Sequence, residues 1–132
     1  MQSDSGQSAL VRVVLVDADD RVRESLCGLL CIGDRLEVVG STGDADPALD
    51  IVRETQPDVV VLDPRLPAVD DGLAFIRRLR AISPDVRVLV MSSTDPADQG
   101  DLAAVSDGFI RKTFRPSELV AAVIAAALPL AG

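Results

Sequence analysis

The feature that most constrains the fold is a regular alternation of short apolar runs with amphipathic stretches. Five runs rich in valine, leucine and isoleucine have the length of β-strands. They cover residues 10–16, 36–41, 58–63, 86–93 and 108–110. After the first run, apolar side chains such as Val22, Leu26 and Leu29 recur at the spacing of a half-buried helix. The alternation predicts an α/β protein.

Runs such as "VVVL" are apolar at every position, which is typical of strands covered by helices on both faces. Alternating βα units with right-handed crossovers predict a doubly wound, five-stranded parallel sheet in a three-layer sandwich. Further helices are predicted over residues 46–56, with Asp46 as N-cap, and over 73–82 and 115–128. A fourth helix is expected within residues 95–105 and should be shortened, because Gly100 interrupts it.

The length of 132 residues suits one domain. We expect a polar tail over residues 1–9, the domain over 10–128, a short tail over 129–132 and no output domain. No membrane span or signal peptide is visible, so a cytoplasmic protein is expected. The net charge is −8 and the basic residues are scattered, which argues against direct binding to nucleic acid.

The composition excludes several kinds of catalytic site. Histidine is absent, which excludes Ser/His/Asp and Cys/His triads and histidine-ligated zinc. The two cysteines, Cys27 and Cys31, lie four residues apart in a predicted helix, a spacing typical of neither a redox motif nor a disulfide framework. We interpret them as small buried thiols. Any chemistry must use carboxylates, hydroxyls and lysine.

Polar residues stand at the carboxyl ends of four predicted strands. They are Asp17, Asp63, Ser92 and Lys112. In an open parallel sheet these ends share one edge, where ligands bind. Two carboxylates, a hydroxyl and an ammonium suit a divalent cation and a phosphoryl group, and a carboxylate can itself accept a phosphoryl group. A single acid at a strand end is more often a helix cap or a solvated loop residue.

Several stretches resemble the receiver domain of bacterial response regulators in two-component signalling. The resemblance covers about residues 10–128, and the best-matching stretches are "VVLVD", "PDVVVLDPRLP", "DGLAFIRRLR", "VRVLVMSS" and "DGFIRK". It implies a flavodoxin-like fold and a phosphoacceptor signalling domain rather than an enzyme. It also implies a histidine kinase or phosphotransfer protein as phosphodonor and an unidentified downstream protein. The absence of histidine means that this chain cannot be the phosphodonor in such a relay.

The resemblance assigns roles residue by residue. Asp63 matches the phosphorylated aspartate, which also binds the metal, Asp17 matches a metal-binding acid, and Arg65 the position whose backbone carbonyl binds Mg²⁺. The residues matching the phosphoryl-binding and switch positions are Ser92, Lys112 and Phe109. Arg65 and Thr94 occupy the two variable positions that tune dephosphorylation in this family.

Ala18 is a departure from the family, which typically has a second metal-binding acid at this place. Losing an anionic oxygen weakens the binding of a hard cation, so we expect weak Mg²⁺ binding and weakened phosphorylation. Asp19 has two interpretations, a compensating metal contact or a capping or solvated acid. Asp20 is predicted to cap a helix that begins at Arg21.

Other departures lie on the face through which receivers signal. The segment "RLPAVDDG" has one residue more than the family's usual spacing between proline and glycine. Thr113 stands where the family often has a proline in a cis bond, which leaves the Lys112–Thr113 bond trans or a strained cis. The last helix is apolar around much of its circumference, which fits either core packing alone or a partner or homodimer surface.

Three functions remain open on the sequence alone. The preferred one is an atypical receiver that is phosphorylated on Asp63 and signals by protein contact. An alternative is a phosphorylation-independent receiver that acts as an interaction module, favoured by Ala18 and the shortened fourth helix. The third is a haloacid-dehalogenase-like phosphatase that uses Asp17 and Asp19, but it leaves Asp63 without a role.

Overall fold

The computed structural model describes residues 10–32, 35–64, 70–92, 104–112 and 115–127. Nine strands and helices lie within them. They are β1 Val11–Val16, α1 Asp20–Leu30, β2 Leu36–Thr42, α2 Ala45–Thr55, β3 Val59–Leu62, α3 Asp70–Ile82, β4 Arg87–Ser92, β5 Gly108–Arg111 and α5 Pro116–Ala127. The five predicted strands are present within one or two residues of their expected ends.

The five strands form one parallel sheet in the order β2-β1-β3-β4-β5. The chain first adds a strand on one side of β1, then returns past it to add the other three. The topological switch point therefore lies between β1 and β3, and the carboxyl ends of all five strands meet at one edge. The predicted doubly wound, flavodoxin-like fold is confirmed.

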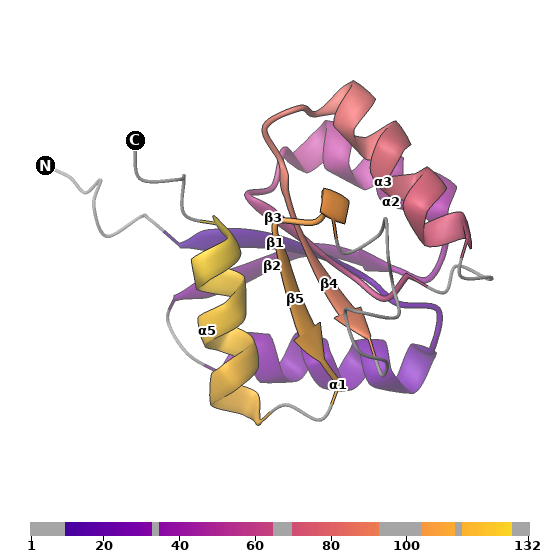
Figure 1. Cartoon of the computed structure of the whole chain (residues 1–132). Helices are drawn as coiled ribbons and strands as arrows, with labels where there is room; N and C mark the ends of the chain where they lie inside the picture. The colour runs from indigo at the N-terminus through magenta and orange to yellow at the C-terminus, as the bar shows by residue number, and fades with distance from the viewer. Residues whose placement is uncertain (1–9, 33–34, 65–69, 93–103, 113–114, 128–132) are drawn as a thin grey trace, which may run out of the picture.

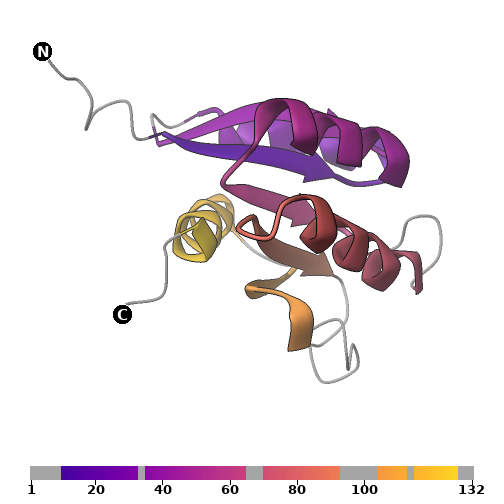
Figure 2. The same cartoon turned by 90° about the horizontal axis from the view of Figure 1, so that it is seen from above.

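The helices cover the two faces of the sheet and give a three-layer sandwich (Figure 1, Figure 2). In β1, Val14 and Val16 pack in a cluster with α2 and α3. Their neighbours Val13 and Leu15 belong to a second cluster with α1 and α5. Because successive strand residues face opposite sides, runs of continuous valine and leucine supply both cores at once.

Two helix starts differ from the sequence prediction. Helix α1 begins at Asp20, and Asp19 is its N-cap, so the prediction that Asp20 caps a helix beginning at Arg21 is wrong. Helix α2 begins at Ala45 with Asp44 in the N-cap place, so Asp46 belongs to the first turn instead. Local loop geometry can move the start of a helix by one or two residues, and the hydrophobic periodicity of the sequence does not record that geometry.

The cysteine prediction is wrong for Cys31 and only partly right for Cys27. Cys27 is half-buried against the α1 and α5 core, but Cys31 is exposed because it follows the last turn of α1 as its C-cap residue. Helix α3 begins at Asp70, three residues earlier than predicted, and α5, at Pro116–Ala127, is one residue shorter than predicted at each end.

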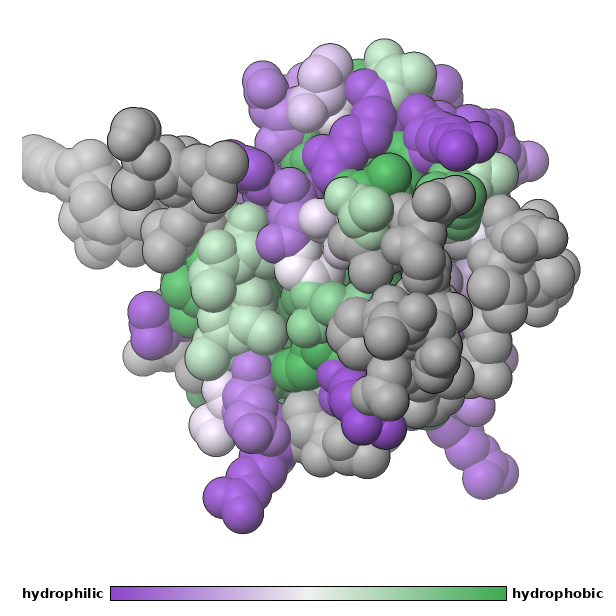
Figure 3. All heavy atoms as spheres, in the orientation of Figure 1, coloured by the Kyte–Doolittle hydropathy of each residue, from purple (hydrophilic) through white to green (hydrophobic). Residues whose placement is uncertain are grey.

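The fourth helix lies mostly outside the described residues. Ala104 and Val105 have helical backbone and lead toward β5, but the shortening predicted for this helix stays a prediction. Helix α5 buries Leu119, Val123 and Ala126. Its surface remains apolar, as the pale green area over α5 in Figure 3 shows. No helix in the described part of the chain is both long and apolar enough to cross a bilayer.

Candidate phosphoacceptor site

Two buried carboxylates lie side by side at the switch point of the sheet. Val16 and Leu62, the last residues of β1 and β3, are paired in register, so Asp17 and Asp63 follow them at the same edge. The backbone N–H of Asp63 donates to the carbonyl of Val16 at 2.9 Å, which extends the ladder up to the acid. Asp17 is 1% exposed and Asp63 is 4% exposed. Burial of two acids is costly without a partner of opposite charge.

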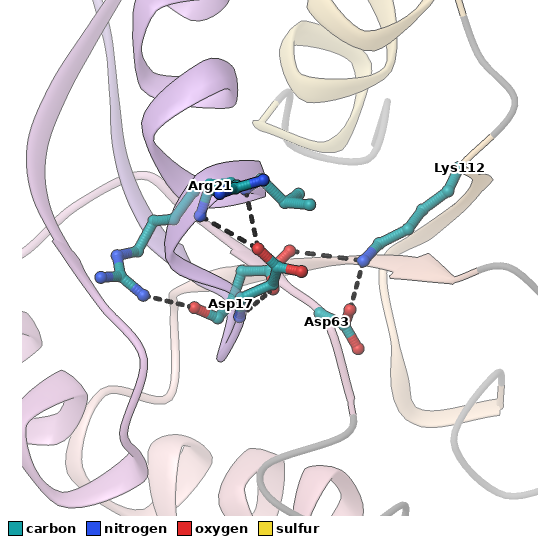
Figure 4. A network of polar contacts seen from close by, with 7 residues as sticks. Asp17, Arg21, Asp63 and Lys112 are labelled. Atoms are coloured by element: carbon teal, nitrogen blue, oxygen red, sulfur yellow. Dashed lines mark hydrogen bonds and ion pairs between the residues drawn. The ribbon is translucent and has the colours of Figure 1, made fainter.

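Lys112 supplies that charge from the end of β5. Its ammonium forms an ion pair with Asp63 Oδ2 and lies 3.4 Å from Asp17 Oδ2, as Figure 4 shows. The lysine side chain is 20% exposed, so most of it is packed within the pocket. Lys112 is the only lysine in the chain. The Lys112 ammonium therefore joins Asp17 and Asp63, which lie 46 positions apart in the sequence.

Ser92 and Lys112 are connected through the backbone. Ser92 ends β4 and is 6% exposed, and its carbonyl accepts the Lys112 N–H at 2.8 Å. Phe109 lies three residues before Lys112 on β5, opposite Val90, and packs half-buried against the α2 and α3 core. The structure thus places the four predicted polar residues, and Phe109, on neighbouring strands that converge on one edge.

The loop after β1 is held by Asp19, whose carboxylate caps α1. Asp19 Oδ1 accepts the backbone N–H groups of Arg21 and Val22 at 3.0 and 3.1 Å. The Asp19 N–H in turn donates to Asp17 Oδ1 at 2.9 Å. Asp20 lies 79% exposed and pairs with Arg23. Of the two interpretations of Asp19, the geometry matches the capping acid.

Ala18 lies in the same loop and is exposed. A hollow borders it, lined also by Asp20, Arg23, Thr42 and Gly43. Among the residues that the structure describes, no three acidic or cysteine side chains come together as a potential metal site. Asp17 and Asp63 are the two buried carboxylates at this edge among the described residues.

Comparison with known proteins identifies the arrangement. A family model for the response regulator receiver domain matches residues 13–124. The chain belongs to this family. Receiver domains are signalling domains of two-component systems that interact with histidine kinases or phosphotransfer proteins, and they generally bind Mg²⁺ at the phosphorylation site. The phosphatase alternative is set aside, because the family is that of receivers and the Asp19 carboxylate is engaged at the start of α1.

Individual relatives support the same assignment. The receiver is 37% identical over 116 residues to the DNA-binding transcriptional activator DevR/DosR of Mycobacterium tuberculosis, covering 86% of this chain and 53% of that protein. It is 33% identical over 116 residues to the response regulator GacA of Pseudomonas viridiflava, covering 86% and 54%. The chain thus spans about half the length of these two curated relatives.

A solved structure extends the likeness to the fold. The crystal structure of a two-component response regulator of the LuxR family from Aurantimonas sp. SI85-9A1 superposes with a TM-score of 0.81. It is 31% identical, and the match covers 89% of this chain and 85% of that one.

Two carboxylates with hard oxygen donors, close enough to share one ammonium, fit the Mg²⁺ that receivers bind. The other predicted participants, Arg65, Thr94 and Thr113, lie outside the described residues, as does most of the altered "RLPAVDDG" loop.

Gly72 shows how α3 packs against the end of β3. A Cβ on Gly72 would collide with the Pro64 carbonyl, so only glycine lets α3 approach the backbone directly after Asp63.

Sequence reasoning missed Arg23 and Gly43, which both contact the backbone after β1. Arg23 reads as a surface arginine on a helix, and its reach to Asp17 depends on where α1 starts. Gly43 follows an edge strand, as many loop glycines do. A signal was present in the spacing, because a residue at the fourth position of a helix that follows a short loop lies over that loop.

Proposed function

We propose that this receiver accepts a phosphoryl group on Asp63 and passes the signal on by protein contact, with a metal site weakened by Ala18. The observation that carries the proposal is the Lys112 ammonium shared between the buried carboxylates of Asp17 and Asp63. A buried aspartate held beside a cation, with a hydroxyl residue on the next strand, suits a phosphoacceptor.

The proposed reaction is a transfer from a phosphohistidine on another protein. A carboxylate oxygen of Asp63 attacks the phosphorus, the P–N bond breaks, and an acyl phosphate forms as the imidazole leaves. The donor belongs to another protein, since this chain contains no histidine. Lys112 and Ser92 would then donate to the oxygens of the transferred group, where the ammonium offsets new negative charge.

The carboxylates of Asp17 and Asp63, together with the proposed carbonyl of Arg65, would hold Mg²⁺. When bound, the metal supplies neutralisation of the charge that gathers during phosphoryl transfer. With alanine at position 18, one anionic oxygen fewer is available than receivers typically provide. We therefore expect phosphorylation to require a higher Mg²⁺ concentration than in receivers with both acids.

Switching would begin with Lys112. The ammonium now pairs with Asp63, so a phosphoryl group on that residue must draw it into a new arrangement. Its backbone is tied to Ser92, and Phe109 lies on the same strand. The proposed signal is a shift between two arrangements of this strand edge, read by a partner protein.

The test is treatment with Mg²⁺ and a small acyl phosphate, followed by intact-mass measurement. A phosphorylated species should form in the natural chain and be absent from Asp63→Asn. Beryllofluoride should shift the amide signals around Ser92 and Lys112 in the same Asp63-dependent way. Absence of both responses at saturating Mg²⁺ contradicts the proposal.

The exposed alanine favours a second candidate, a receiver that acts as an interaction module without phosphorylation. This candidate predicts equal binding of a partner by the natural chain and by Asp63→Asn, with and without the phosphodonor. A phosphodonor-dependent change in partner affinity, lost in Asp63→Asn, would contradict it.

A further inference from the structure

Arg23 reaches from the first turn of α1 to the backbone of Asp17. Its Nη1 donates to the Asp17 carbonyl at 2.7 Å, and its Nη2 lies 2.6 Å from Asp20 Oδ1. The Arg23 side chain is only 19% exposed, whereas that of Asp20 is 79% exposed. The well-covered contact is therefore the one to Asp17, because an ion pair with a solvated acid contributes little.

Gly43 confines the guanidinium from the end of β2. A Cβ at this position would lie 2.9 Å from Arg23 Nη1, 3.3 Å from the Asp17 carbonyl oxygen and 3.4 Å from Ala18 Cα. The bare backbone of Gly43 thus packs directly on Arg23 and on the peptide that joins Asp17 to Ala18. Any side chain at position 43 would have to displace the flexible end of the arginine first.

These contacts fix both polar groups of the Asp17 backbone. Its N–H donates to the Thr42 carbonyl at 3.1 Å and its carbonyl accepts from Arg23. The carboxylate is then divided between two partners, Oδ1 receiving the Asp19 N–H and Oδ2 lying toward Lys112. Where the main chain of Asp17 sits therefore decides where its carboxylate meets Asp63.

We propose that Arg23, seated against Gly43, is a positioning residue that sets the Asp17 carboxylate for cation binding. The inference rests on the proposed function, because it assigns the cation to the pocket of Asp17 and Asp63. With Ala18 in place of a second acid, Asp17 and Asp63 are the two buried acids that the described residues bring to this pocket. A displacement of the Asp17 backbone would therefore move one of the two carboxylates proposed to hold the cation.

The experiment compares three variants of the full chain. Arg23→Gln removes the fork that binds the Asp17 carbonyl, and Gly43→Ala displaces the guanidinium while keeping its charge. Asp20→Asn is the matched control, because it removes the exposed ion pair and leaves the Asp17 contact intact. Mg²⁺ affinity is measured by calorimetry, and unfolding free energy by urea denaturation.

We expect Arg23→Gln and Gly43→Ala each to weaken Mg²⁺ binding by about threefold to tenfold, the effect of one hydrogen bond. Asp20→Asn should stay within about twofold of the natural chain. Since Arg23→Gln and Gly43→Ala break the same contact, the double variant should bind Mg²⁺ no more weakly than the single variant with the lower affinity. If the losses of binding free energy in the two single variants add up in the double variant, the proposal is contradicted.

A metal-free readout separates positioning from general stability. In both variants the Asp19 amide proton should shift in NMR spectra without Mg²⁺, because its acceptor is the Asp17 carboxylate. Selective ¹⁵N labelling of lysine gives one backbone amide signal, that of Lys112, because it is the sole lysine in the chain. This Lys112 signal should also shift in both variants. Lower unfolding free energy with unchanged Mg²⁺ affinity and unchanged signals would overturn the proposal.

The outcomes also separate this inference from the proposed function. If the natural chain forms no Asp63 adduct and binds no Mg²⁺, the proposed function fails, and with it the role in cation binding. If the natural chain does both and the variants equal it, only the inference about Arg23 fails. If Arg23→Gln does not fold, Gly43→Ala still tests the inference, because it retains every charge of the natural chain.

Discussion

At the scale of single residues, the stretch "DADD" contains four positions with four different environments. Asp17 is buried in the pocket, Ala18 is exposed, Asp19 caps α1 and Asp20 lies in solvent beside Arg23. The acids are therefore not interchangeable, and the structure gives Asp19 the capping role predicted for Asp20. Under the proposed function, the residue at position 18 would set how much negative charge the pocket offers a cation.

Restoring an acid in Ala18→Asp should tighten Mg²⁺ binding about tenfold, because it adds an anionic oxygen donor beside Asp17. The hollow that Ala18 lines has room for the longer side chain. Ala18→Asn is the matched control, since it adds a similar shape without the charge. Calorimetric titration of the three proteins checks the order, and equal affinity of the two variants would refute the role given to charge here.

Replacing the cap in Asp19→Ala should lower the free energy of unfolding by about 1 kcal/mol, because two backbone N–H groups of α1 lose their acceptor. Asp19→Asn should cost only a few tenths of that, since asparagine caps about as well. Urea denaturation measures both. Mg²⁺ affinity should stay unchanged in Asp19→Asn but fall in Asp17→Asn, and an equal loss in both would restore Asp19 as a metal contact.

At the scale of elements, Asp107 connects three segments at the edge of the sheet where β4 begins. Its Oδ2 accepts the Val88 N–H at 2.8 Å and pairs with Arg80 of α3 at 2.9 Å. Arg80 also donates to the carbonyls of Val86 and Val105. One aspartate and one arginine thus tie α3, β4 and the residues leading into β5 together.

Asp107→Ala should lower the free energy of unfolding by about 1–3 kcal/mol, because it leaves a backbone N–H of β4 and the Arg80 guanidinium without this acceptor. Asp50→Ala is the comparison, since Asp50 pairs with Arg53 on the exposed surface of α2. It should change stability by less than about 0.5 kcal/mol. Equal urea midpoints for the two variants would contradict the role of Asp107 as a connecting residue.

At the scale of the whole molecule, Lys112 joins acids that follow β1 and β3 to the end of β5. Removal of the ammonium leaves two buried carboxylates facing each other, so the proposed phosphoacceptor pocket and the stability of the fold are linked. A divalent cation that binds the folded state alone should offset the loss.

Lys112→Met should therefore unfold at a lower temperature than the natural chain in the absence of divalent cations, by a shift equivalent to about 1–3 kcal/mol. Added Mg²⁺ should raise the unfolding temperature of the variant more than that of the natural chain, since the variant has no ammonium competing for the carboxylates. Differential scanning calorimetry with and without Mg²⁺ measures this difference. Equal increments in the two proteins would contradict the competition between Lys112 and the metal.

The amino-acid sequence by itself determined the fold class and the edge at which the site lies. Continuous valine and leucine runs predict strands buried on both faces, and a parallel sheet brings their carboxyl ends together. Asp17, Asp63, Ser92 and Lys112 could therefore be assigned to one edge before any coordinates. These conclusions depend on periodicity and chain direction, which each segment carries locally.

Only the tertiary structure decided which acid caps α1 and that the Lys112 ammonium contacts both Asp17 and Asp63. It also showed that Arg23 and Gly43 lie against the backbone of Asp17. A shift of α1 by one residue in its register against the sheet would move every side chain of that helix by about 100° around its axis. Such contacts depend on loop geometry and on segments far apart in the chain, and no local pattern of residue types records them.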